Sequence, residues 1–155
     1  IQFKSKNPYK IKITGRTKHF INAFGEEIII DNAERALQAA CKKTGAVIDE
    51  YTTGPVFMED NNTGAHEWIV EFFTEPLDIE QFVTYLDDAL KSLNSDYEAK
   101  RYKDLTLERP RMIKAPKGTF YRWMKSRNKV GGQNKIPRLS NDRQYLDELK
   151  KMLNK

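Results

Sequence analysis

Polar and apolar residues alternate in several short stretches of this chain, which is the pattern of β-strands. The clearest strand covers residues 66–73, whose even-numbered side chains share one face with Trp68. Residues 47–58 predict another strand, which Gly54 and Pro55 should interrupt or bend. The remaining strand predictions are residues 9–14, a hairpin over residues 20–30 and a short last strand over residues 111–114.

Apolar residues at helical spacing predict two long helices and three shorter ones. The first long helix should begin at Asp31, a capping residue, and end at Gly45. The second should begin near Asp78, and its apolar stripe is expected to be core. That stripe consists of Ile79, Phe82, Val83, Leu86, Leu90 and Leu93. The shorter helices are predicted over residues 94–102, 118–127 and 141–153.

Strands and helices do not alternate with the regular spacing of a doubly wound fold. We therefore predict the α+β class: a small sandwich with a three- to four-stranded, largely antiparallel sheet, helices on its face and an N-terminal β-hairpin. The length of 155 residues fits a single domain over residues 1–155.

Charge is distributed unevenly along the chain. Residues 1–99 contain 10 Lys and Arg against 17 Asp and Glu, whereas residues 100–155 contain 17 against 5. A basic C-terminal third attracts phosphate groups.

No apolar run approaches the length of a membrane span, so we expect no membrane partner. The single cysteine, Cys41, fits a reducing, cytoplasmic compartment and is expected in the core, and no His/Cys cluster predicts a metal site.

Two basic segments are candidates for contact with phosphate. Residues 132–138 read Gly-Gln-Asn-Lys-Ile-Pro-Arg, so that Lys135 lies between flexible glycines and a proline that fixes φ. Residues 14–18 form a glycine turn that offers Arg16 and Lys18 to an anion. From spacing alone, either segment is equally well a solvated surface loop.

Taken together, these segments resemble a known family. Residues 15–18 (Gly-Arg-Thr-Lys) and the Asn-x-x-Gly-Glu hairpin of residues 22–26 resemble the start of the small C-terminal domain of adenylate-forming enzymes. Residues 94–101, 118–120 and 132–138 narrow the resemblance to the acyl-acid amido synthetases, the auxin-responsive Gretchen Hagen family of plants and its bacterial relatives. The resemblance covers nearly the whole chain.

The resemblance implies a mobile C-terminal cap domain of a bacterial-type, ATP-dependent acyl-acid amido synthetase. Residues 1–30 would be a hinge-proximal strand and hairpin, and residues 31–155 the α+β body. The expected partner is an N-terminal adenylating domain of the same protein, which would hold ATP, Mg²⁺ and a carboxylic acid that is then joined to an amine. The start at Ile1, directly before strand-like sequence, favours a segment of a longer protein. Without a Ser/Thr/Gly-rich phosphate loop, this chain should be inactive alone.

By the same resemblance, Lys135 would be the catalytic lysine of adenylation. Arg138 would support it through phosphate or interdomain contacts, and Arg16 and Lys18 would lie near the nucleotide or the hinge. Arg101 is expected to be an ordinary surface ion-pair residue.

Three alternatives stay open from the sequence. One is the cap domain of an acyl-CoA ligase, and another is a ligand-binding domain without catalysis. The third is a nucleic-acid-binding module, suggested by the aromatic residues Phe120, Tyr121 and Trp123 among cations. Against the third, the strands lack the aromatic pair of RNA-binding sheets and the first two thirds of the chain are acidic, so we do not expect a nucleic-acid partner.

Overall fold

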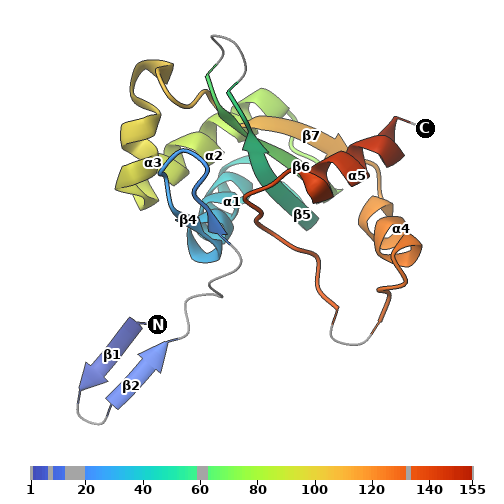
Figure 1. Cartoon of the computed structure of the whole chain (residues 1–155), viewed down its shortest axis with the longest axis horizontal. Helices are drawn as coiled ribbons and strands as arrows, with labels where there is room; N and C mark the ends of the chain where they lie inside the picture. Colours follow the sequence, from blue (N-terminus) through green and yellow to red (C-terminus); the bar gives the residue numbers. More distant parts are fainter. Residues whose placement is uncertain (1, 7–8, 13–19, 59–62, 132–133, 155) are drawn as a thin grey trace.

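A three-stranded mixed sheet forms the centre of the protein (Figure 1). The computed structural model describes residues 2–6, 9–12, 20–58, 63–131 and 134–154. In the sheet, β6 (Ala65–Thr74) lies between β5 (Val47–Val56), with which it is antiparallel, and β7 (Arg111–Ala115), with which it is parallel. Two antiparallel strand pairs precede it: β1 (Gln2–Lys6) with β2 (Tyr9–Lys12), and β3 (Phe20–Ile21) with β4 (Ile28–Ile29). The α+β prediction and its N-terminal hairpin are confirmed.

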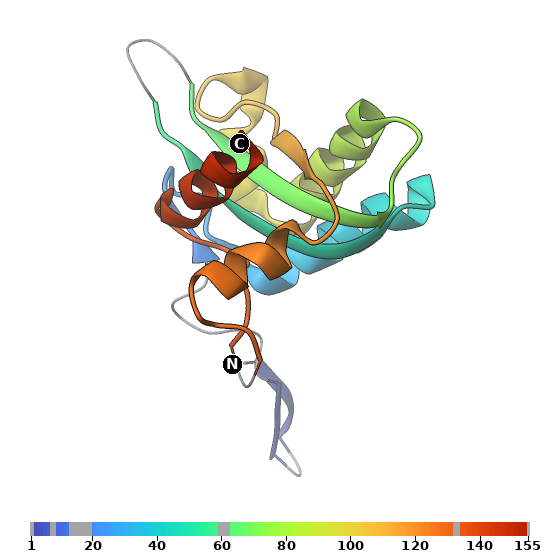
Figure 2. The ribbon, with the colours of Figure 1, turned by 90° about the vertical axis from the view of Figure 1, so that its right-hand side faces the viewer.

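Helices cover both faces of the sheet (Figure 2). On one face α1 (Ile30–Thr44) and α2 (Ile79–Leu93) pack over Trp68, Val70 and Phe72. On the other, α4 (Thr119–Ser126) and α5 (Gln144–Leu153) pack over Ile69. A short α3 (Ser95–Lys100) and a 3₁₀ turn (Tyr102–Asp104) follow α2. Side chains on the two faces of the predicted strand at residues 66–73 therefore pack into two separate hydrophobic cores.

The two long helices begin differently from each other. Asp78 caps α2 as predicted, because its Oδ1 accepts hydrogen bonds from the N–H groups of Glu80 at 2.8 Å and Gln81 at 3.1 Å. The predicted Asp31 cap of α1 is wrong: the helix begins one residue earlier, and Asp31 lies inside its first turn. Gly45 ends α1 in the left-handed conformation (φ +72°), as predicted.

The predicted interruption of the β5 strand at Gly54 and Pro55 is also wrong. The ladder passes through both residues in register, with Pro55 opposite His66, and its irregularities lie instead between Val47 and Glu50. The sheet tolerates Pro55 because β5 is a terminal strand, where a missing N–H breaks no inner ladder. Residues 61–64, whose Asn-Asn-Thr-Gly sequence predicts a turn between these strands, fall largely outside the described residues.

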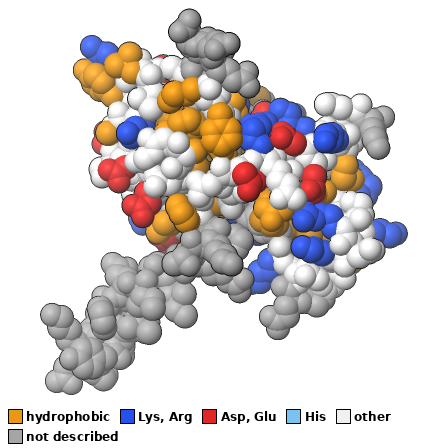
Figure 3. Space-filling model, in the orientation of Figure 1, with side chains coloured by type: hydrophobic (Ala, Val, Ile, Leu, Met, Phe, Trp, Pro, Cys, Tyr) orange, Lys and Arg blue, Asp and Glu red, His pale blue; other side chains and the backbone are white. Residues whose placement is uncertain are grey.

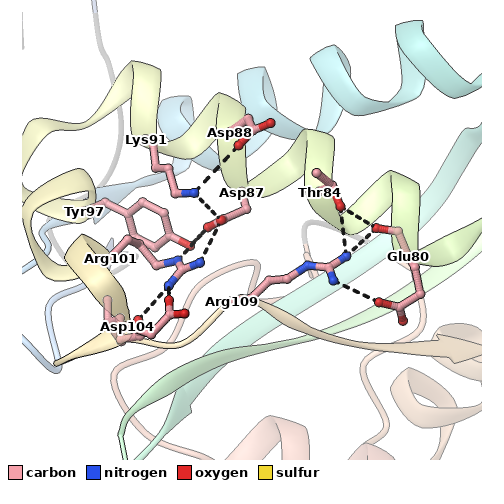
Figure 4. Close-up of polar contacts among 10 residues, drawn as sticks. Glu80, Thr84, Asp87, Asp88, Lys91, Tyr97, Arg101, Asp104 and Arg109 are labelled. Carbon is pink, nitrogen blue, oxygen red and sulfur yellow. Dashed lines mark hydrogen bonds and ion pairs between the residues drawn. The ribbon is translucent and has the colours of Figure 1, made fainter.

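The segment after α2 is held by buried charges (Figure 4). Arg101, only 9% exposed, donates to both carboxylate oxygens of Asp87, and Tyr97 Oη donates to Oδ1 of the same carboxylate at 2.7 Å. Burial would raise the pKa of Asp87, but hydrogen bonds from Arg101, Lys91 and Tyr97 outweigh it and hold that pKa below its ordinary value. The expectation that Arg101 forms a surface ion pair is therefore wrong in its location: the pair is internal.

A second buried pair ties the loop between β3 and β4 to the sheet. Glu26 Oε1 lies 2.8 Å from His66 Nε2, and Glu26 Oε2 accepts a hydrogen bond from the N–H of Phe24 at 2.7 Å. Both members of the pair are almost completely buried. Burial would raise the pKa of Glu26, yet the contact with His66 lowers it overall. The loop is thereby fixed against β6.

Candidate functional site

A cavity of about 1080 Å³ opens between α4, the residues that follow it and the end of β6. Lys and Arg side chains gather over this part of the molecule (Figure 3). The cavity's cations come from the turn before α4 and the chain after it, and its carboxylates come mainly from α1 and β5. The cations are Lys117, Lys129, Lys135 and Arg138, and the acids include Glu34, Asp49 and Glu50. The cavity therefore offers opposite charges from different elements.

Lys135 lines this cavity and is exposed to solvent. Within the described part of the chain it forms no ion pair, unlike Arg138 and Arg143 later in the chain. The preceding Asn134 donates from Nδ2 to the carbonyl of Gly131 at 3.2 Å. An uncommitted ammonium at a cavity wall can approach a negatively charged group without first breaking an ion pair.

The chain directly after Lys135 lies along the outer edge of β5. Thr52 Oγ1 donates to the carbonyl of Pro137 at 2.6 Å, and the N–H of Thr53 donates to the carbonyl of Arg138 at 2.9 Å. The N–H of Ser140 then donates to the carbonyl of Thr53 at 3.1 Å. Residues 137–140, called here the edge segment, thus form a single parallel β-bridge with β5, between Leu139 and Thr53.

Arg138 is anchored within the protein. Its guanidinium lies 4.5 Å from the centre of the Tyr51 ring, and Nη2 forms an ion pair with Glu50 Oε2 at 3.1 Å. The geometry of the latter contact is that of an ion pair rather than of an aligned hydrogen bond. Burial raises the pKa of Glu50 and of Tyr51, and Arg138 opposes both shifts. To contact a phosphate, this guanidinium would exchange Glu50 for the new anion.

Glu71 occupies the N-terminal end of α4, at the cavity wall. It comes from β6, is buried, and accepts hydrogen bonds from the N–H of Gly118 and, at 3.1 Å, from the N–H of Phe120. These are N–H groups that a helix cannot satisfy internally. The strand pattern places Glu71 on a face of β6 but gives no sign that it caps a helix 47 residues later.

Three further residues were singled out from the sequence. Arg16 and Lys18 fall outside the described residues. Cys41 is half-buried on α1, where burial raises the pKa of its thiol. Within the ranges that the structure describes, no group of His, Cys, Asp and Glu is arranged to hold a metal ion. None of the helices in those ranges is long and apolar enough to cross a membrane.

Comparisons with known proteins agree with this architecture. A family described as the GH3 family C-terminal domain matches residues 31–144. A solved GH3.15 acyl acid amido synthetase superposes with a TM-score of 0.70 at 16% identity, over 89% of this chain and 27% of that one. A structure of AtGH3.15 acyl acid amido synthetase in complex with 2,4-DB gives 0.69 at 15% identity, over 89% and 26%. This chain thus spans only about a quarter of those proteins, and no curated protein matches it.

Proposed function

This chain belongs to the GH3 family through its C-terminal domain, and from that premise we propose that it is the mobile cap of an ATP-dependent acyl-acid amido synthetase. The parent enzyme would be a bacterial-type, cytoplasmic member of the adenylate-forming superfamily. In this proposal residues 1–30 are the hinge-proximal part and residues 31–155 the body. The cap works on an N-terminal adenylating domain of the same protein and is inactive alone.

The observation that carries the proposal is the location of Lys135. Its ammonium is exposed at the wall of a large cavity, and the chain two residues later is tied to β5. Adenylation develops negative charge on the α-phosphate and on the leaving pyrophosphate. A lysine whose backbone is anchored close by can neutralise that charge and favour the transition state.

The proposed reaction has two half-reactions. In the first, a carboxylate oxygen of the acid attacks the α-phosphorus of ATP, and pyrophosphate leaves. In the second, the amine nitrogen attacks the acyl carbonyl carbon, AMP leaves and a proton is lost from the nitrogen. Charge on the phosphates changes most in the first half-reaction, so Lys135 acts there and not in the second.

The remaining cations have supporting roles in this proposal. Arg138, Arg16 and Lys18 contact the nucleotide or the hinge, and Arg138 would leave Glu50 to do so. The described residues offer no acidic cluster for a metal ion, and Mg²⁺ would be held by the N-terminal domain.

The test is Lys135→Ala in the full-length enzyme, compared with Lys129→Ala at the same cavity. Acid-dependent ATP–pyrophosphate exchange should fall roughly 100-fold or more for Lys135→Ala, because a charge-stabilising group is lost. Reaction of a preformed acyl-adenylate with the amine should change less than about threefold, and Lys129→Ala should leave both rates nearly intact. Equal loss in both half-reactions would exclude the assigned role. Transfer of the acyl group to coenzyme A in preference to any amine would favour the acyl-CoA ligase alternative.

A further inference from the structure

We propose that Thr52 is a positioning residue for Lys135, an inference that rests on the adenylation role proposed for that lysine. Thr52 lies on β5, and its side chain is buried. Its hydroxyl donates to the carbonyl of Pro137 at 2.6 Å. This bond joins the rigid sheet to a point two residues from Lys135.

Among the hydrogen bonds that join β5 to the edge segment in the described residues, the bond from Thr52 to Pro137 is the one nearest to Lys135 in the sequence. Backbone bonds between β5 and the edge segment start at Arg138, whose carbonyl accepts from Thr53. Pro137 has no N–H, so the backbone ladder cannot be extended through its nitrogen. Pro137 keeps its carbonyl, and the Thr52 hydroxyl donates to that carbonyl, so this side-chain bond extends the attachment by one residue.

The residues between this tie and Lys135 have little freedom. Pro137 fixes its own φ, and a residue before proline is restricted to extended conformations, which applies to Ile136. The side chain of Ile136 also packs against the core beneath α4 and α5. A fixed Pro137 carbonyl therefore limits where the backbone of Lys135 can lie. Small displacements of a reacting group are known to reduce rates strongly.

The sharpest variant is Thr52→Val, which keeps the shape of the side chain and removes the donor. We expect adenylation in the full-length enzyme to slow roughly tenfold, because the Pro137 carbonyl loses its buried partner. Amide formation from a preformed acyl-adenylate should be unchanged. Thr52→Ser, which keeps the hydroxyl, should restore most of the adenylation rate.

Thr53→Val is a matched control. Thr53 is as buried as Thr52, and its hydroxyl also donates to a carbonyl, that of Glu67 at 3.0 Å, but this bond lies within the sheet. Both variants lose one hydrogen bond from a buried threonine hydroxyl, and only Thr52→Val loses a bond to the edge segment. Comparable slowing of adenylation by the two variants would assign the effect to general destabilisation and overturn the inference.

Two measurements separate positioning from other effects. In a Lys135→Ala background Thr52→Val should cause no further loss of adenylation, because a residue that acts through Lys135 has nothing left to position. Trypsin should cut after Lys135 faster in Thr52→Val than in wild type or Thr53→Val, as scored by mass spectrometry of the peptides. A tenfold loss that persists in the double variant, or unchanged cleavage, overturns the inference while the proposed function stands. If Lys135→Ala alone leaves adenylation intact, the proposed function fails and this role fails with it.

Discussion

Asp87 and Arg101 form a two-point ion pair inside the protein: Arg101 Nε lies 2.8 Å from Asp87 Oδ1, and Nη2 lies 2.9 Å from Oδ2 (Figure 4). Lys91 adds a third cationic contact at 2.7 Å, and Tyr97 donates from its hydroxyl. Arg101 also donates to the carbonyl of Leu107 at 2.8 Å. The pair therefore links α2, α3 and the chain that leads to β7.

Replacement of Asp87 by Asn should lower the free energy of unfolding by about 3–5 kcal/mol, because it leaves the buried Arg101 charge without its counter-ion. Urea unfolding at pH 7 would measure the change. The matched control is Glu80→Gln in the neighbouring pair with Arg109, where the Glu80 side chain is 75% exposed and the ion pair spans 3.0 Å (Figure 4). That variant should cost less than about 1 kcal/mol. Similar losses in both variants would contradict a special role for the buried pair.

The same carboxylate predicts how stability depends on pH. The pKa of Asp87 lies below its ordinary value in the folded protein, so its contribution to stability is complete above that ordinary value, 3.8. The contribution is lost as the pH falls through the folded-state pKa. The stability difference between wild type and Asp87→Asn should therefore be constant near neutral pH and shrink below about pH 4.

Glu71→Gln should loosen the start of α4. Gln keeps one acceptor oxygen, so it can accept from only one of the N–H groups of Gly118 and Phe120, and about 1–3 kcal/mol of local stability should be lost. Hydrogen exchange of at least one of those two amides should become faster. Glu75→Gln is the control, since Glu75 directly follows β6 and its ion pair with Lys114 is largely exposed. Unchanged exchange at both amides would show that the carboxylate does not cap the helix.

Gly54→Ala should disturb the attachment of the chain after the edge segment. An added Cβ would lie 2.9 Å from the carbonyl oxygen of Asp142 and 3.1 Å from Leu146 Cδ1, and the backbone oxygen has little room to retreat. We expect a loss of about 1–3 kcal/mol in urea unfolding, typical of overpacking. Gly45→Asn is a suitable control, because nothing lies within 4 Å of its added Cβ and Asn tolerates the left-handed conformation there. A neutral Gly54→Ala would mean that residues 142–146 can move away from β5.

Local sequence patterns predicted the elements whose signals are contained within a few residues. Helix α2 is such a case, since the cap at Asp78 and the apolar stripe that follows lie in one continuous stretch. Lys135 and Arg138 line the same cavity for the same reason, because both come from one seven-residue segment. Glu34 and Asp49 were not anticipated there, because only the packing of α1 beside β5 brings them to it.

The local sequence patterns missed the features that depend on packing between residues far apart in the chain. Alternation placed Glu67 and Glu71 on one face of β6, but it could not show that α4 and α5 cover that face. Glu67 is buried there and bonds to Arg143 at 2.8 Å and Lys150 at 2.9 Å. Arg143 directly precedes α5 and Lys150 lies seven residues later within it, so both fall on one side of the helix. This spacing was the sequence signal that could have paired them with a common acidic residue. Burial would raise the pKa of Glu67, but the two cations lower it overall.

The direction of β7 relative to β6 could also have been inferred from the sequence. The sheet was expected to be largely antiparallel, yet β6 and β7 are parallel. Parallel neighbours need a long crossover, and the chain between them contains α2 and α3. The long helical connection was recognised in the sequence, but its consequence for strand direction was not.

The edge segment has a consequence beyond the lysine that precedes it. A terminal strand such as β5 would otherwise present open N–H and C=O groups to neighbouring chains, and such edges start intermolecular β-sheet growth. At Thr53 both of these groups are occupied by Arg138 and Ser140. Substitutions that detach the edge segment from β5 should therefore promote self-association at high protein concentration. The need to remain soluble thus limits how weakly the chain next to Lys135 can be attached to the sheet.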